Sequence, residues 1–128
     1  MTPPPITLTR TNTILYCSHW QETVDFYRRL LRFPVAFENK WFVEFQLMDH
    51  SYLSIVDAAR ATIASVAGQG ITLTWQVADL EGVHSYLQAQ GIAATQIQHI
   101  WRSRVFYCHD PEGHRLEFWA QETAAPSA

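Results

Sequence analysis

Few side chains in this sequence stand at the spacing that catalysis or metal binding requires. Cys17 and Cys108 are far apart and form no Cys-x-x-Cys pair. The six histidines contain no His-x-His or His-x-x-x-His pair, and there is no Gly-x-Ser-x-Gly nucleophile elbow. The one lysine, Lys40, lies in an expected turn, where Schiff-base chemistry is not expected. We therefore expect no covalent catalysis by thiol, serine or lysine, and we interpret the histidines as structural or surface residues.

The size and charge of the chain exclude several broad classes of protein. It has 128 residues, with 9 Lys and Arg against 12 Asp and Glu, and a formal net charge of -3. This length fits one compact domain. Without a basic patch we expect no nucleic-acid partner. No stretch approaches the ~20 apolar residues of a membrane span, and residues 1–10 are no signal peptide. We expect a cytoplasmic protein with reduced thiols and no membrane partner.

The first half of the chain predicts one strand, one helix and three further strands. Residues 11–17 are β-branched and aromatic, and the Ser18-x-x-Gln21 spacing that follows is typical of a capping box at a helix start. Apolar residues recur at helical spacing from Trp20, and Pro34 ends the helix. Extended segments follow at residues 34–38, 41–48 and 52–57, which places a first βαβββ module at residues 11–57.

The second half repeats this order after a weakly patterned linker at residues 58–70. A strand is expected at residues 71–77, Asp79 is the expected N-cap of a helix, and Gly91 is its expected C-terminal stop. Three more strands are expected at residues 92–98, 101–108 and 114–120, which places a second module at residues 71–120. Residues 1–10 and 121–128 are then an N-terminal arm and a C-terminal tail of one domain.

The two modules align at a nearly constant spacing, which indicates an internal repeat. Trp41 matches Trp101 at a spacing of 60 residues, and the fourth strands align at 62, which places Ile55 opposite Glu117. One helix per module cannot cover both faces of the strands. We therefore predict an α+β fold in which two βαβββ modules form a curled, cup-shaped mixed sheet with the helices on its convex side. Such a cup is a place for a ligand.

Three segments of the sequence carry a family resemblance. Residues 25–31 read DFYRRLL, residues 77–80 read VADL, and residues 110–119 read DPEGHRLEFW. With these three segments placed in a duplicated βαβββ order, the chain resembles the vicinal oxygen chelate superfamily. This superfamily includes glyoxalases, bleomycin-resistance proteins and extradiol dioxygenases. The resemblance implies a fold of two modules that acts on or binds small molecules, commonly as a homodimer.

The resemblance also implies where a metal would be bound: at the starts of the first and fifth strands and the ends of the fourth and eighth. Those four places hold Asn12, Thr72, Ile55 and Glu117. Zinc and non-haem iron usually need at least three strong imidazole or carboxylate ligands. Of the four residues only Glu117 has such a side chain, so we expect no metal in the family site and no cofactor.

Alternation along the strands selects the side chains that would line the cup, because residues two apart share a face. Aromatic rings mixed with hydrogen-bonding groups suit a flat organic ligand, and the expected ligand-binding residues are Asn12, Tyr16, Trp41, Phe45, Thr72, Gln76, Trp101 and Trp119. Glu117 and Tyr107 are the candidate catalytic residues. A core position is the alternative for each ring. For Glu117 the alternative is a structural role, paired with an arginine such as Arg115 or hydrogen-bonded to Asn12 or Thr72.

Two functions are consistent with these residues. The first is a metal-independent protein that binds and sequesters a flat or partly apolar organic ligand. The second is an enzyme, such as a lyase, isomerase or dioxygenase-like protein, that acts on a carbonyl or aromatic substrate with Glu117 as acid or base and Tyr107 beside it. A metal enzyme with a different set of histidine ligands is a third alternative.

We expect two partners, a small organic ligand and a second copy of the chain that covers an apolar rim.

Overall fold

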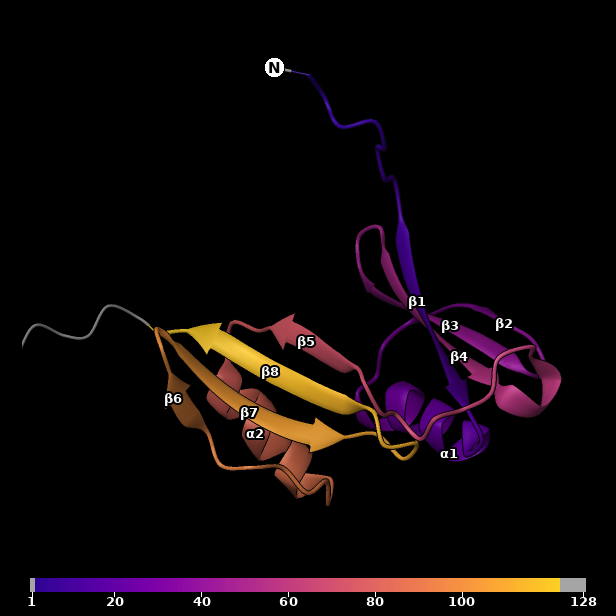
Figure 1. Ribbon diagram of the computed structural model, residues 1–128. Helices are drawn as coiled ribbons and strands as arrows, with labels where there is room; N and C mark the ends of the chain where they lie inside the picture. The colour runs from indigo at the N-terminus through magenta and orange to yellow at the C-terminus, as the bar shows by residue number, and fades with distance from the viewer. Residues whose placement is uncertain (1, 123–128) are drawn as a thin grey trace, which may run out of the picture. The chain divides into compact units, whose positions relative to one another are not determined.

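The first half of the chain folds into a four-stranded mixed sheet with a helix on one face. The computed structural model describes residues 2–122 and divides into two compact units between Val66 and Ala67. The first unit contains β1 (Thr11–Cys17), α1 (Trp20–Asp25), the π-helical η1 (Phe26–Leu30), β2 (Val35–Glu38), β3 (Phe42–Met48), β4 (Ser51–Asp57) and the 3-10 turn η2 (Ala58–Arg60) (Figure 1). The strand order is β1-β4-β3-β2, with β1 parallel to β4 and the other neighbours antiparallel.

The helix of the first unit begins at Trp20, two residues after Ser18 of the predicted capping box. His19 is the N-cap residue and its side chain makes no capping hydrogen bond; instead its carbonyl accepts from both the amide and the hydroxyl of Thr23, at 3.0 and 2.7 Å. Trp20 donates its indole N–H to the Ile55 carbonyl at 2.9 Å, which ties the helix to the central strand β4. Tyr27 is fully buried beneath the sheet.

The second half of the chain forms a second sheet with the same topology. It contains β5 (Thr72–Gln76), α2 (Leu80–Ala89), β6 (Gln98–Ile100), β7 (Ser103–His109) and β8 (Arg115–Gln121). The strand order is β5-β8-β7-β6, and only β5 and β8 pair in parallel. Helix α2 lies along one face of this sheet (Figure 1). The predicted α+β fold, with two βαβββ modules and curled mixed sheets, is thereby confirmed.

Helix α2 begins and ends where its sequence predicts. The Asp79 carboxylate accepts a hydrogen bond from the Gly82 amide at 3.0 Å, which satisfies one of the free N–H groups of the first turn. Gly91 follows the last turn at a φ of 80°, a conformation that suits glycine. Leu80 and Leu87 are buried under the sheet, which stabilises the helix by removing apolar surface from water.

One predicted strand of the second module is wrong. Residues 92–97 are not a strand, and the edge strand β6 occupies only Gln98–Ile100. The segment is held by other bonds, because Thr95 exchanges two hydrogen bonds of 2.9 Å with the backbone of Tyr107 and its carbonyl is 2.8 Å from the His84 ring. Thr95 therefore joins the α2–β6 connection to β7.

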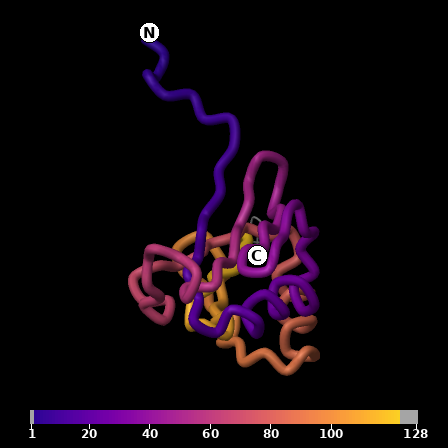
Figure 2. Tube along the Cα trace, turned by 90° about the vertical axis from the view of Figure 1, so that its right-hand side faces the viewer, coloured from indigo at the N-terminus to yellow at the C-terminus, as the bar shows by residue number. Residues whose placement is uncertain are grey.

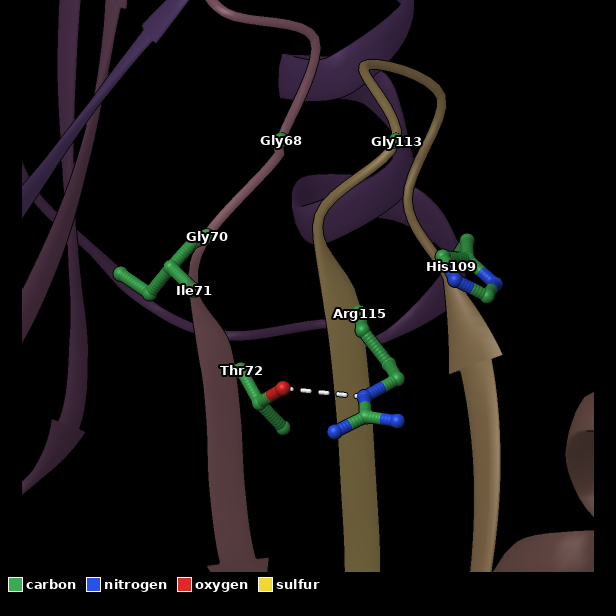
Figure 3. Close-up of a pocket in the computed structure, with 7 residues that line it drawn as sticks. All are labelled: Gly68, Gly70, Ile71, Thr72, His109, Gly113 and Arg115. Carbon is green, nitrogen blue, oxygen red and sulfur yellow. Dashed lines mark hydrogen bonds between the residues drawn. The ribbon is translucent and has the colours of Figure 1, made fainter.

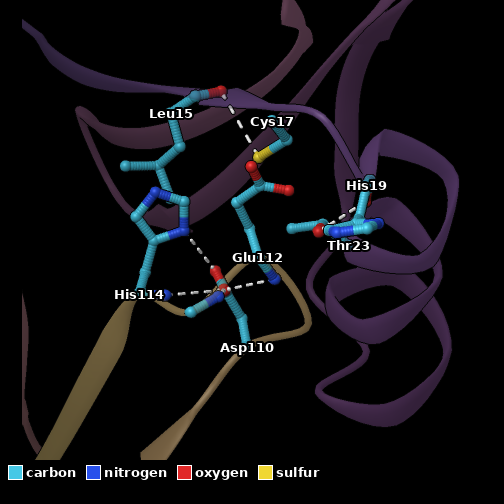
Figure 4. A network of polar contacts seen from close by, with 8 residues as sticks. Leu15, Cys17, His19, Thr23, Asp110, Glu112 and His114 are labelled. Atoms are coloured by element: carbon cyan, nitrogen blue, oxygen red, sulfur yellow. Dashed lines mark hydrogen bonds and ion pairs between the residues drawn. The ribbon is translucent and has the colours of Figure 1, made fainter. Parts of the chain in front are cut away.

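A buried carboxylate holds the turn between β7 and β8. One oxygen of Asp110 accepts from the backbone amides of Glu112, Gly113 and His114, at 2.9 to 3.0 Å. Its other oxygen lies 2.8 Å from Nδ1 of His114 (Figure 4). Asp110, Glu112 and His114 are each at most 5% exposed. This network fixes the hairpin that carries Tyr107 and Glu117.

The sequence predicts an N-terminal arm and a C-terminal tail, which the structure describes in part. Residues 2–10 extend away from β1 in both views (Figure 1 and Figure 2). Strand β8 includes Gln121, while residues 123–128 of the expected C-terminal tail and Met1 of the N-terminal arm lie outside the described residues. Within residues 2–122, neither helix has the length and apolar character that a membrane span requires.

Candidate functional site

Glu117 lies on the face of the second sheet that α2 does not cover. The register aligns Thr74 on β5, Glu117 on β8 and Tyr107 on β7 in one row across neighbouring strands. The Thr74 hydroxyl donates a hydrogen bond to the Glu117 carboxylate, and the Tyr107 hydroxyl is hydrogen-bonded to the same carboxylate. The carboxylate is therefore held by hydroxyl groups on both sides. Thr72, one of the partners expected for Glu117 from the sequence, accepts a hydrogen bond from Arg115 instead.

The pKa of Tyr107 is raised above its ordinary value. The main cause is its hydrogen bond to Glu117, with desolvation and the negative charge of Glu117 adding to it, while Arg115 acts in the opposite sense. Ionisation of the phenol would place a second negative charge beside the carboxylate and break that bond. At neutral pH Tyr107 thus stays protonated and acts as a hydrogen-bond donor.

Other polar and aromatic side chains share this surface, which we call the Glu117 face. Arg115 donates from Nε to the Thr72 hydroxyl at 2.9 Å, and its guanidinium carbon lies 4.7 Å from the centre of the Tyr107 ring. Alternation places Thr72, Gln76 and Trp119 on the same side as Glu117. Of the residues expected to bind ligand, these three therefore share one surface with the two candidate catalytic residues.

The corresponding face of the first sheet carries a second polar network, which we call the Asn12 face. Asn12 donates to a Glu44 oxygen at 3.3 Å and accepts from the Ser54 hydroxyl at 2.9 Å. Arg10 pairs with the same Glu44 oxygen at 2.8 Å, and its guanidinium lies 3.6 Å from the centre of the Tyr52 ring. Tyr16 is half-buried and lies on this face by alternation from Asn12.

The structure corrects two residues that sequence reasoning placed on the ligand side of the first sheet. Phe45 is fully buried, and its ring centre lies 6.0 Å from that of Tyr27 in the helical segment, so it belongs to the core. Ile55 is also fully buried on the helix side, and the position that corresponds to Glu117 is Ser54. The spacing from Ser54 to Glu117, and from Glu44 to Tyr107, is 63 residues.

The two tryptophans that suggested a constant spacing are not equivalent. Trp101 is in the turn before β7, with a φ of 57° and 91% exposure, whereas Trp41 is half-buried against the Phe42 ring, 5.9 Å away between centres. Their match at 60 residues assigned the wrong alternation to β3 and so missed Glu44, while the spacing of 62 between the fourth strands missed Ser54 by one residue.

The residues at the family's metal positions do not form a metal site. In the first sheet the two positions hold Asn12 and Ser54, an amide and a hydroxyl already hydrogen-bonded to each other. In the second sheet Glu117 is bonded to two hydroxyl groups, and Thr72 binds the Arg115 guanidinium. Zinc and iron need several imidazole, thiolate or carboxylate ligands. Within residues 2–122, no three His, Cys, Asp or Glu side chains are grouped to hold such an ion.

Comparison with known proteins places this geometry in a family. Similar solved structures include a glyoxalase/bleomycin resistance protein/dioxygenase from Nocardioides, 20% identical with a TM-score of 0.77, covering 99% of this chain and 91% of that one. A lactoylglutathione lyase from Agrobacterium tumefaciens is 18% identical with a TM-score of 0.70, covering 93% and 96%. TnmS3, an antibiotic binding protein from Streptomyces sp. CB03234, is 17% identical with a TM-score of 0.76, covering 93% and 99%.

These structural likenesses concern the fold, while the sequence itself establishes the family. A comparison with curated proteins gives no match. The model of one protein family matches residues 8–118, which is most of the chain and includes both modules. The chain therefore belongs to the Glyoxalase/Bleomycin resistance protein/Dioxygenase superfamily.

Proposed function

We propose that the protein binds a small, flat or partly apolar organic ligand without a metal ion, and sequesters it rather than transforming it. The observation that carries this proposal is the bonding of Glu117. Its carboxylate accepts from the hydroxyls of Thr74 and Tyr107, and the positions where relatives with metal would need further ligands hold Asn12 and Ser54. The structural likeness to an antibiotic binding protein supports binding as the function.

The chemistry of the Glu117 face suits such a ligand. The rings of Trp119 and Tyr107 offer aromatic surface. Hydrogen-bonding groups lie on the same or neighbouring strands, and they belong to Gln76, Thr74 and Glu117. A flat ring system gains free energy from stacking on the aromatic groups, and the polar groups select its orientation. Tyr16 and Trp41 of the first unit remain predicted contacts of the ligand.

A binding experiment with a matched control tests this proposal. Bleomycin and a planar quinone antibiotic are titrated into the protein with EDTA present, and tryptophan fluorescence is followed. We expect saturable binding of at least one of them, weakened about tenfold by Glu117→Gln, because a hydrogen bond to a charged group contributes about 1.5 to 3 kcal/mol. Glu22→Gln removes the same charge from an exposed helical site and should leave the affinity unchanged.

Two outcomes would contradict metal-independent binding at this face. One is binding that EDTA abolishes and a divalent metal restores. The other is equal affinity of the wild type and Glu117→Gln for every ligand that binds. Thermal unfolding of both variants controls for stability, since loss of stability with unchanged binding would assign Glu117 a structural role.

The hydrogen bond between Tyr107 and Glu117 favours a second candidate function, acid–base catalysis on a carbonyl or aromatic substrate. In this alternative the carboxylate takes a proton from the substrate, and the protonated phenol donates a hydrogen bond to the developing oxyanion. Deuterium exchange at the carbon next to a carbonyl, followed by NMR, would detect the step. Exchange that falls about 100-fold or more in Glu117→Gln would favour the enzyme over the binding protein.

We also propose that the protein is a homodimer. Large apolar side chains are exposed at the ends and edges of both sheets, among them Phe37 at 55%, Met48 at 72% and Trp101 at 91%. A second copy would remove such surface from water. Light scattering at micromolar concentration is expected to give twice the 14.7 kDa mass of the chain. The mass of a single chain would contradict the dimer.

A cytoplasmic location is part of the same proposal. Cys17 and Cys108 are both buried, and within residues 2–122 neither takes part in a disulfide. Burial, together with the nearby Asp110 charge, raises the pKa of Cys108 to about 11, so its thiol is not ionised at neutral pH. Buried cysteines that form no disulfide are typical of a protein in a reducing compartment.

A further inference from the structure

A pocket lies at one end of the second sheet, beside the strand ends rather than at Glu117. Its volume is about 410 Å³. It is lined by the loop residues Gly68, Gly70 and Ile71, by Thr72 at the start of β5, by Gly113, and by the side chains of His109 and Arg115 (Figure 3). All of these residues belong to the second unit.

The charged side chains of the pocket are both basic. Arg115 and His109 are cross-strand partners on β8 and β7, and the Arg115 guanidinium is turned toward Thr72 (Figure 3). Among the described residues neither has a carboxylate partner within ion-pair distance. A bound oxyanion would supply a charged acceptor for the Arg115 guanidinium.

Acidic groups near the pocket are occupied elsewhere. Asp110 and Glu112 belong to the adjoining turn but are buried and do not line the pocket; Asp110 accepts from backbone amides and His114. Glu117 lies two residues along β8 and is bonded to Thr74 and Tyr107. Among the described residues, therefore, no carboxylate lines the pocket to compete with an anionic ligand.

The wall of the pocket is built from closely packed glycine backbone. A Cβ on Gly68 would lie 2.3 Å from the carbonyl carbon of Gly113 and from the amide nitrogen of His114, and a Cβ on Gly113 would lie 2.5 Å from the Ala67 carbonyl oxygen. Both glycines have positive φ, +74° and +109°. Glycine is suited to such contacts because it lets a ligand or another chain segment approach the backbone. Thr72 accepts from Nε of Arg115 and so orients the guanidinium, whose remaining N–H groups form a planar donor set.

We propose that this pocket binds the oxyanion group of a small molecule, a carboxylate or a phosphate, with Arg115 as the principal donor and His109 beside it. This pocket adjoins the Glu117 face and shares Arg115 and Thr72 with it, but the oxyanion site goes beyond the ligand-binding function proposed there and does not depend on it. Planar guanidinium groups recognise carboxylate and phosphate through paired N–H donors.

The test is a titration of the full chain with sodium phosphate, and separately with sodium acetate, at constant ionic strength maintained with chloride. Backbone amide signals of Gly68, Gly70 and Gly113 are followed by NMR. We expect saturable shifts with a dissociation constant of about 1 mM, which corresponds to about −4 kcal/mol. The tighter of the two anions identifies the preferred class of ligand.

Substitutions distinguish a site from a general effect of charge. Arg115→Gln should weaken binding about tenfold or more, and Arg115→Lys should weaken it less, because lysine keeps the charge but not the planar donor set. Arg102→Gln removes an equal charge outside the pocket and should have no effect. Thermal unfolding and unchanged distant amide signals show that each variant is folded.

The proposal is overturned if the glycine amides show no saturable shift with either anion, or if Arg115→Gln and Arg102→Gln respond alike. Glu117→Gln separates this site from the proposed function. It should weaken the organic ligand but not phosphate or acetate, since it removes a negative charge near Arg115. Loss of one binding activity with retention of the other thus shows which proposal fails.

Discussion

Asp110→Ala is expected to lower the free energy of unfolding by about 3 to 5 kcal/mol, because it breaks a buried pair and leaves buried donors unsatisfied. The carboxylate accepts from three backbone amides and from His114, and the substitution removes this shared acceptor. Urea unfolding followed by tryptophan fluorescence measures the change. Glu117 and Tyr107 should lose their alignment in the same variant, since the turn joins their strands.

Asp79→Ala is the matched control for this substitution. Asp79 also accepts from a backbone amide, that of Gly82, but it is an exposed N-cap. Loss of an N-cap costs about 0.5 to 2 kcal/mol. Equal losses of stability in the two variants would show that the Asp110 network contributes no more than an ordinary cap.

Gly68→Ala is expected to be the second large loss, about 2 to 5 kcal/mol, from overpacking together with backbone strain. Its Cβ would lie 2.3 Å from two backbone atoms of the β7–β8 turn, and backbone atoms cannot move aside as a flexible side chain can. Chemical denaturation measures the loss. Phosphate binding should fall in the same variant, because the wall of the pocket must shift.

Gly70→Ala separates the effect of close packing from the effect of backbone conformation. Gly70 also has a positive φ, +82°, but no atom lies within 4 Å of the position of a Cβ. Only the strain of a left-handed alanine then applies, about 1 to 2 kcal/mol. If both alanine variants lose the same stability, the close packing of Gly68 on Gly113 is not what stabilises this loop.

The arrangement of the second module was largely predictable from its residues. Asp79 begins α2 and Gly91 follows its end, because capping and positive φ are properties of single residues and their nearest neighbours. Thr72, Gln76, Tyr107, Glu117 and Trp119 share one face, as alternation predicted. This alternation has a period of two residues, so it can be read within each strand.

The first module shows where such reasoning fails. Phe45 was assigned to the ligand side because Trp41 was aligned with Trp101, yet the true correspondence is shifted by three residues and Phe45 packs on Tyr27. A register bulge between Gln46 and Met48 also interrupts the alternation of β3. Any shift by an odd number of residues exchanges the two faces of a strand.

The sequence by itself determined the duplicated βαβββ order, the family, and the loss of most metal-ligating residue types, because these depend on local pattern and residue identity. Only the tertiary structure decided which side chains meet: Thr74 and Glu117 are 43 residues apart, and Asn12 and Ser54 are 42 apart. Those contacts depend on the pairing register between distant strands, which packing of the whole sheet selects and local alternation does not. The pocket at Arg115 has the same origin, since Gly68 meets Gly113 only when the two loops are brought together by β5 and β8.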